Sequence, residues 1–213
     1  MLDFACSTGV VVRFSLALTL LIAVPVSANP LLEREILLEL NRARADPRAY
    51  AERLTVYRGY FRGKIVRYPG NPNGLLTAEG TAAVDEAIRA LRQQQPVTTV
   101  RSAPLLTRTA RDHVEEQGAR GVTGHESANG DRVRQRLVRR GGGDYVAEVI
   151  TYGPPSAVEV VRQLIVDDDV PDRGHRRSVY AAEWAYAGAA CGPHKRYKIM
   201  CVVTFARTET GRP

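Results

Sequence analysis

The chain has 213 residues, a formal net charge of +7 and 44% hydrophobic residues. This length is sufficient for one domain with a substantial hydrophobic core. The basic charge is compatible with nucleic acid, anionic lipid or the polyanions of a cell envelope as partners. However, no run of six cations with interleaved aromatic residues occurs, which argues against a specific nucleic-acid-binding protein and favours a solvated basic surface.

The first 28 residues have the pattern of an export signal. Arg13 precedes an apolar run from residue 14 to residue 25, and Val26, Ser27 and Ala28 follow. The run is too short to span a bilayer and ends in an A-x-A-like cleavage signal. We therefore expect cleavage after Ala28 and a secreted or periplasmic protein with no further transmembrane span; an anchored N-terminal helix is the alternative.

Capping residues and apolar spacing predict helices in residues 29–99. Asn29 and Pro30 open a helix that should end near Ala45, and Asp46 with Pro47 starts a second one through Leu54. A further helix should run from residue 77 to just before residue 96. Between these helices, residues 57–74 are rich in Arg, Gly, Tyr and Pro and have no apolar period. We interpret them as a long surface loop, the most mobile part of the mature chain.

Residues 100–206 alternate between helix and strand patterns. Helices are predicted at 104–118, 131–140 and from Ser156 onwards, and strands at 145–151, 184–190 and 197–205. The last two strands should pair antiparallel. The pattern predicts an α+β fold in which helices flank a small antiparallel sheet. His113 lies on the apolar face of the helix 104–118, and we interpret it as a core or boundary residue.

Two cysteines remain after Cys6 leaves with the signal. Cys191 and Cys201 are separated by a turn-like segment that contains Gly192 and Pro193. Two strands that fold back through this turn would place the sulfur atoms opposite each other, which predicts a structural disulfide worth about 2–3 kcal/mol. A reactive thiol or a metal ligand is the alternative, and the lack of a C-x-x-C motif disfavours it.

The residues with the most chemistry lie between positions 167 and 176. Asp167, Asp168, His175 and their neighbours directly follow an apolar helical run, so polar groups are placed at the edge of a buried element. A further acid, Glu148, shares one face of its predicted strand with two apolar neighbours. A buried carboxylate would require a partner or a metal, whereas Glu148 on an edge strand could reach solvent. Strand phase alone leaves both interpretations open.

Common catalytic motifs do not match this sequence. His125 and Glu126 are not part of an H-E-x-x-H zinc helix, because the required position holds Asn129. There is no G-x-S-x-G, and Gly141 to Gly143 lack the Lys of a phosphate loop. The dispersed set of His125, Glu148, His175 and the aspartates remains. Two imidazoles with carboxylates suit zinc or another divalent ion with open coordination positions.

Several segments, in order and spacing, resemble the CAP superfamily of cysteine-rich secretory, antigen-five and pathogenesis-related (SCP-like) proteins. The matching segments are Leu105-Leu106-x-x-x-Ala110-x-x-His113, Gly124-His125, Ala147-Glu148-Val149-Ile150-x-Tyr152-Gly153, Arg173-Gly174-His175-Arg176 and the end with Cys191 and Cys201. The resemblance covers residues 100–206. It divides the chain into a leader (1–28), an N-terminal extension (29–99), the CAP core (100–206) and a tail (207–213).

This resemblance implies a three-layer α–β–α sandwich with a surface cleft that holds two histidines and two acids. His125, Glu148 and His175 match family positions, and the fourth acid is either Asp167 or Asp168. The sequence departs from the pattern where Val149 replaces the usual Asn and where Ser178 stands in place of a common Asn. The resemblance also favours the buried interpretation of Glu148.

The resemblance leaves the activity open, because no enzymatic reaction shared by the family is established. We expect a secreted binding domain whose cleft takes zinc or another divalent cation through His125 and His175, and we assign no catalytic residue. A metal-dependent hydrolase of envelope polymers or peptides, with Glu148 as the base, is an alternative. A lipid- or sterol-binding module and a purely structural polar cluster are also compatible with these residues.

Overall fold

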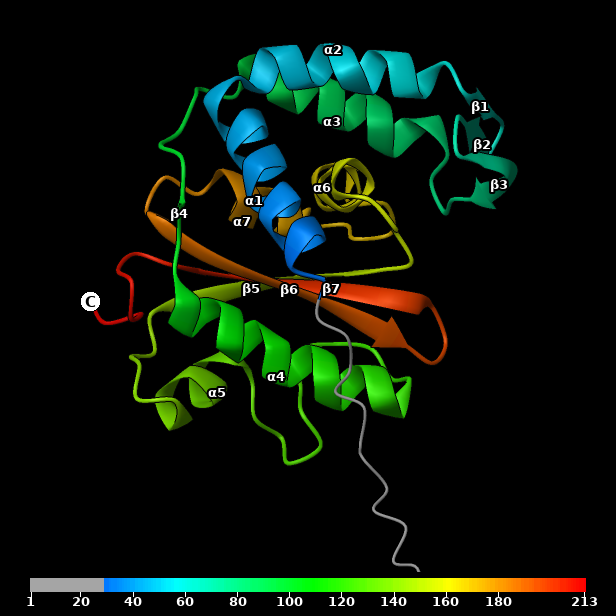
Figure 1. Cartoon of the computed structure of the whole chain (residues 1–213). Helices are drawn as coiled ribbons and strands as arrows, with labels where there is room; N and C mark the ends of the chain where they lie inside the picture. The colour runs from blue at the N-terminus through cyan, green and yellow to red at the C-terminus, as the bar shows by residue number, and fades with distance from the viewer. Residues whose placement is uncertain (1–28) are drawn as a thin grey trace, which may run out of the picture.

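A four-stranded sheet divides the protein into two helical sides, in a computed structural model that describes residues 29–213 (Figure 1). The strand order is β4 (Arg101–Ser102), β6 (Tyr186–His194), β7 (Lys198–Ala206) and β5 (Val146–Tyr152). All neighbours are antiparallel except the short β4, which is parallel to β6. The leader predicted for residues 1–28 lies outside the described residues.

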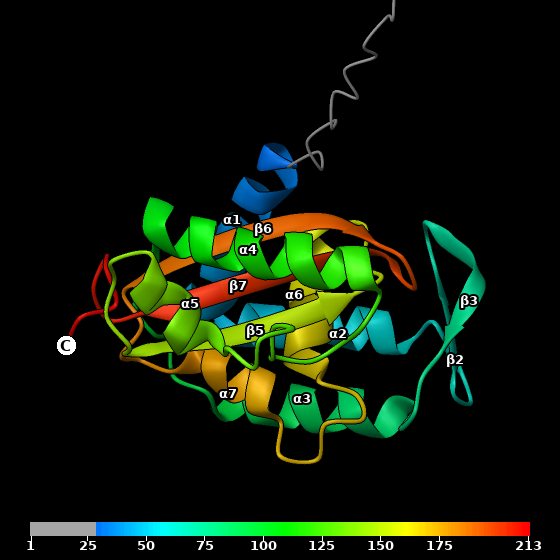
Figure 2. The ribbon, with the colours of Figure 1, turned by 90° about the horizontal axis from the view of Figure 1, so that it is seen from below.

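Helices cover both faces of this sheet. On one face lie α4 (Pro104–Arg120) and α5 (Val133–Arg139). On the other face lie α1 (Pro30–Ala45), α6 (Ala157–Val166) and α7 (Gly174–Tyr180), with α2 (Pro47–Arg58) and α3 (Thr81–Gln93) as an outer pair (Figures 1 and 2). The α+β sandwich expected from the sequence is therefore confirmed.

Three helices begin where the sequence places their capping residues, whereas α3 begins at Thr81 and not at residue 77, and α7 was not predicted. The side chain of Asn29 accepts a hydrogen bond from the backbone of Leu32, and Asp46 accepts one from Ala49 in the same way. Ser156 caps α6. Each cap satisfies a backbone N–H that has no partner within its helix, so the start of the helix is encoded locally.

Residues 57–74 are not an irregular loop, and that prediction was wrong. Three short strands form a small antiparallel sheet: β1 (Phe61–Arg62), β2 (Ile65–Tyr68) and β3 (Asn71–Leu76). Strands of two to six residues are too short to show an alternating apolar pattern, and Gly63 and Gly70 adopt positive φ between them. This hairpin stands at one end of the molecule (Figure 2). Its mobility stays a prediction.

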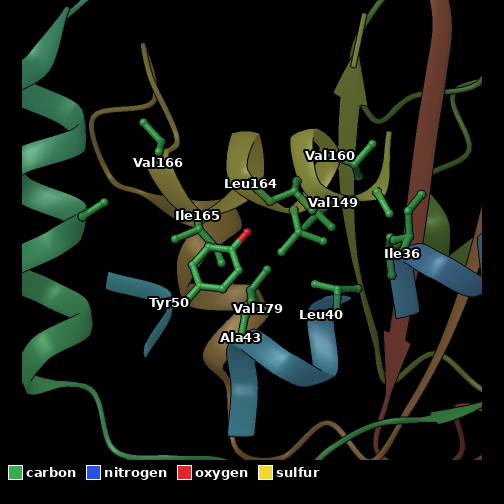
Figure 3. Packing of buried hydrophobic residues seen from close by; sticks show 14 of the residues in the cluster. Ile36, Leu40, Ala43, Tyr50, Val149, Val160, Leu164, Ile165, Val166 and Val179 are labelled. Atoms are coloured by element: carbon green, nitrogen blue, oxygen red, sulfur yellow. The ribbon is translucent and has the colours of Figure 1, made fainter. Parts of the chain in front are cut away.

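The main hydrophobic core joins the N-terminal extension to the sheet. Ile36, Leu40 and Ala43 of α1 face Val160, Leu164 and Ile165 of α6, and all six side chains are buried (Figure 3). Tyr50, Val179 and Val149 extend the same cluster into α2, α7 and β5. The extension is therefore part of one continuous core with the strands, because neither side could bury this apolar surface alone.

A buried arginine strengthens this connection. The guanidinium of Arg44, fully buried in α1, donates hydrogen bonds to the carbonyl groups of Thr98, Val179, Ala181 and Trp184. Three of these carbonyls lie at or just after the C-terminal end of α7, where helix carbonyls have no partner within the helix. Arg44 thus fixes the end of α7 to the N-terminal extension.

The predicted disulfide joins Cys191 of β6 to Cys201 of β7, whose Cα atoms are 4.2 Å apart. The two residues are directly opposite in the strand register, as the turn-like segment between them predicted. Among the described residues, none of the helices has the length and apolar character needed to cross a membrane.

Candidate functional site

Two histidines from opposite sides of the sheet meet in a cleft. His125 lies in the loop between α4 and α5, and His175 lies in the first turn of α7. Their ring centroids are 6.4 Å apart. Both line a cleft of about 460 Å³ together with Ile150 and Tyr152 of β5 and the residues at the end of α6. The structure thus brings together two of the residues that the sequence analysis selected.

Asp167 is the acid that holds His175. Its Oδ1 lies 2.6 Å from Nδ1 of His175, and its Oδ2 accepts the backbone N–H of the same residue at 2.9 Å. Asp167 is the C-cap of α6 and adopts a left-handed conformation with φ 57°, which turns its carboxylate back towards α7. The side chain of Asp167 is 1% exposed and that of His175 is 25% exposed. A buried acid therefore orients a partly exposed imidazole.

Glu148 holds His125 in the same manner from β5. Its Oε1 lies 3.0 Å from Nδ1 of His125, and its Oε2 pairs with the guanidinium of Arg136. The side chains of Glu148 and Arg136 are each 1% exposed, whereas that of His125 is 43% exposed. Burial alone would raise the pKa of Glu148, but the hydrogen bond from His125 and the charge of Arg136 outweigh it and hold the pKa below its ordinary value.

A hydrogen-bond network fixes the backbone next to His125. The N–H of Gly124 donates to the hydroxyl of Tyr152, and its carbonyl accepts from Gln117 at 2.7 Å. Nε2 of His113 lies 3.0 Å from the same carbonyl. His113 is fully buried, and this burial lowers its pKa. His113 is thus a core residue, as the sequence predicted, that supports the His125 loop.

Asp168 lines the cleft but serves mainly as a structural acceptor. Its two carboxylate oxygens accept the backbone N–H groups of Ala78 and Glu79, just before α3. Arg173 pairs with Glu79 and Glu86, and Arg176 also pairs with Glu86. The acidic and basic residues around His175 therefore mostly bind the segment 167–176 to the start of α3.

The two histidine–carboxylate pairs have the same chemical consequence. A carboxylate only accepts hydrogen bonds, so in each pair Nδ1 of the imidazole carries the proton and donates it. The other ring nitrogen, Nε2, then keeps its lone pair, and no hydrogen bond occupies it in either histidine among the described residues. Carboxylate-oriented imidazoles of this kind are typical of metal-binding histidines.

Arg136 is the site residue that the sequence analysis missed. The sequence analysis predicts a solvated basic surface and does not single out Arg136, yet its guanidinium also donates to the carbonyls of His125 and Asp131. Its position relative to the apolar residues offered a signal. Arg136 lies three residues after Val133 and directly before Leu137, both of which face inward, so all three share the buried side of α5.

The sequence profile of the cysteine-rich secretory protein family (CAP) matches residues 86–205, more than half of the chain. The chain belongs to the CAP family. The matched range contains His125, Glu148, Asp167 and His175, and it begins inside α3, so part of the predicted extension falls within it. A search of curated proteins finds no significant match.

Solved structures of bacterial proteins show a distant likeness to this CAP-family chain. An extracellular protein containing an SCP domain from Bacillus anthracis has 17% identity and a TM-score of 0.45, with 57% of this chain and 37% of that protein covered. An outer surface protein of Borrelia burgdorferi has 15% identity and a TM-score of 0.43, with coverage of 51% and 77%. A cysteine-rich secretory protein from Staphylococcus aureus has 12% identity and a TM-score of 0.38, with coverage of 58% and 36%. The chain thus spans little more than a third of two of these proteins.

Proposed function

We propose that this CAP-family protein is an exported binding protein whose cleft takes a divalent cation through His125 and His175. The observation that carries the proposal is the pair of imidazoles, each held at Nδ1 by a buried carboxylate, with Nε2 left for a ligand. The leader pattern and the disulfide support a location outside the cytoplasm, secreted or periplasmic.

The donor set fits an ion that keeps open positions. Within residues 29–213 no group of three or more His, Cys, Asp or Glu side chains has the geometry of a metal site. The protein would therefore supply two neutral nitrogen donors, and water or a bound ligand would complete the coordination. Zinc and similar borderline ions accept imidazole donors, whereas magnesium and calcium prefer oxygen.

The carboxylates favour a binding role over hydrolysis. A general base must have a free carboxylate oxygen to take a proton from bound water. Both oxygens of Glu148 already contact His125 and Arg136, and its lowered pKa makes it a weaker base. Glu148 and Asp167 are therefore assigned to orienting the imidazoles, and we propose no catalytic residue.

Zinc titration by calorimetry on the oxidised chain 29–213 tests the proposal. We expect measurable binding near neutral pH that is lost in His175→Ala and weakens near pH 5, because protons compete with the metal for the imidazole nitrogens. Arg177→Ala is the control on the same helix, since Arg177 is exposed and does not line this cleft. Zinc binding that survives His175→Ala would contradict the proposal.

Substitution of Asp167, the acid that orients His175, gives a second test of zinc binding with its own control. Asp167→Asn should weaken zinc binding about 10- to 100-fold, because the amide cannot hold the His175 proton as the carboxylate does. Asp144→Asn should bind zinc like the wild type, since Asp144 is exposed and does not line the cleft. Asparagine suits the left-handed backbone at position 167.

A further inference from the structure

The cleft runs along an unpaired sheet edge. β5 is the last strand of the sheet, with β7 on one side and no strand on the other among the described residues (Figure 2). His125 comes from the loop between α4 and α5, and His175 comes from α7. Elements from the two faces of the sheet therefore each contribute one imidazole to the cleft beside β5.

The strand register shows which backbone groups point into the cleft. The N–H of Gly153 donates to the carbonyl of Ile199, which continues the pairing of Tyr152 with Met200 by one residue. Hydrogen-bonding direction alternates along a strand, so Thr151 and Val149 also face β7, whereas Tyr152, Ile150 and Glu148 present their N–H and C=O groups to the free edge.

The disulfide supports the same assignment. The Cα atoms of Cys191 and Cys201 are 4.2 Å apart, which is the short spacing of a pair that does not exchange hydrogen bonds. The backbone groups of Cys201 must therefore point the other way, to Thr151 of β5. The main-chain N–H and C=O groups of Ile150 and Tyr152 point away from β7. Within residues 29–213, no other backbone group forms a hydrogen bond with them.

A second hollow continues the cleft along the strand direction. It has a volume of about 370 Å³ and an apolar wall that includes Leu75, Leu76, Val84 and Pro154. The two hollows share the following lining residues: Tyr152, Gln163, Asp168 and Tyr197. Ile150 lines the cleft and Pro154 lines this second hollow. The four-residue step between them spans about 13 Å in an extended chain. We call the combined depression the β5 groove.

The β5 groove is acidic although the chain is basic overall. Its acids are Glu159 and the three aspartates 167–169, and Arg162 is its only Lys or Arg among the lining residues. Arg162 lies over the rings of Tyr57 and Tyr68 and 3.7 Å from Glu159, so its charge is already opposed. A neutral or basic occupant is therefore favoured over an acidic one.

We propose that the β5 groove binds an extended, neutral or basic peptide segment that adds to the sheet as a strand beside β5. Alternating unpaired N–H and C=O groups are complementary to another extended backbone, and the apolar hollow takes one side chain of the peptide. This inference rests on the proposal that the cleft is a binding site, and it does not require the metal.

Residue-resolved amide exchange on chain 29–213 in EDTA tests the pairing, with the blocked peptide Lys-Thr-Leu-Thr-Lys as the probe. Ile150 is only 6% exposed, so we expect its amide and that of Tyr152 to exchange faster than the bonded amides of Val149 and Thr151 in the dilute protein, and to slow about tenfold with peptide. The amides of Val149 and Thr151 are already bonded to β7 and serve as internal controls. Binding of the peptide without slowing at Ile150 and Tyr152, or no binding at millimolar peptide, would overturn the proposal.

Two N-methylated peptides give a test that needs no knowledge of register. In a strand, alternate N–H groups face the neighbouring strand. One peptide is N-methylated at both Thr residues, and the other at Leu and both Lys residues, so each peptide has a different edge blocked. We expect one of the two peptides to lose binding and the other to keep it. Equal binding of both would contradict strand pairing. The acidic peptide Glu-Thr-Leu-Thr-Glu should bind more weakly than the basic one.

Exposed leucines provide matched variants for the hollow. Leu76, in the hollow, is 73% exposed, and Leu31, on α1 outside the groove, is 66% exposed. Leu76→Ser should weaken peptide binding about threefold or more, whereas Leu31→Ser should not change it.

If Ile150 and Tyr152 are protected in the peptide-free protein and this protection depends on protein concentration, a second copy occupies the edge and the peptide assignment is wrong.

Zinc titration of the same protein after removal of the EDTA separates this inference from the metal proposal. Protection of the amides by the peptide in EDTA, together with no zinc binding, would refute only the metal proposal. Zinc binding that needs His175, together with no protection by the peptide, would refute only the peptide proposal.

Discussion

At the scale of single residues, Arg136 decides how Glu148 behaves. Both side chains are 1% exposed, and Arg136 neutralises the carboxylate that orients His125. A buried carboxylate without a cation is strongly unfavourable because it loses its hydration. The proposed cleft therefore depends on a cation that makes no contribution to the cleft lining itself.

We predict that Arg136→Met lowers the free energy of unfolding by about 3–5 kcal/mol, because it leaves the carboxylate of Glu148 buried without a cation. Arg134→Met is the matched control. Arg134 lies on the same helix but is exposed, so its replacement should change stability by less than about 0.5 kcal/mol. Urea unfolding of both variants measures the difference, and equal midpoints would show that the ion pair makes no net contribution.

At the scale of elements, α7 depends on its neighbours. A seven-residue helix is too short to be stable alone, yet it carries His175. Its first turn is bound through Arg173 and Arg176 to Glu79 and Glu86, and its end is bound through Arg44. The position of His175 is therefore set by residues that lie far away in the sequence.

Acid should loosen this attachment. Hydrogen bonds from Arg173 hold the pKa of Glu79 at about 2, well below the ordinary value of about 4.5. Because the folded pKa is lowered, the stabilising contribution is complete above about pH 4.5 and is lost as the pH falls towards 2. We predict that Glu79→Gln reduces the drop in unfolding free energy between pH 5 and pH 2.5, measured by urea unfolding. Glu52→Gln, an exposed control, should keep the wild-type drop.

Local signals explain which parts of the fold were predictable. The caps Asn29, Asp46 and Ser156 and the helical spacing of apolar residues act within a few positions, so the starts of α1, α2 and α6 were predicted correctly. The short α7, which depends on distant residues, was not predicted. His125, Glu148 and His175 could be selected because they match family positions. The choice between Asp167 and Asp168 could not be made from sequence, because it depends on the left-handed backbone at the end of α6.

At the scale of the whole molecule, the N-terminal extension and the CAP core share one interior. The side chains of α1 pack on α6, and the fully buried Arg44 binds carbonyls that follow α7. Residues of the extension also line the β5 groove through Leu75 and Leu76. The extension is thus a structural part of the cleft region and not an appended segment.

We predict that a chain of residues 97–213 does not fold cooperatively, because removal of α1 to α3 exposes the main core and leaves the end of α7 without Arg44. The chain 29–213 is the control. Proton–nitrogen correlation spectra should show wide dispersion for the control and narrow dispersion for the shorter chain. A well-dispersed spectrum from residues 97–213 would show that the core of the CAP domain is self-sufficient.

Arg44 binds the carbonyl of Trp184, and the indole of this tryptophan gives the molecule an intrinsic fluorescence signal. Trp184 is the only tryptophan in the chain, its indole is buried, and its ring lies beside that of Tyr145. A buried indole emits at shorter wavelengths than one in water. Fluorescence from this single side chain therefore reports, without any added label, whether the segment after α7 that Arg44 binds stays folded.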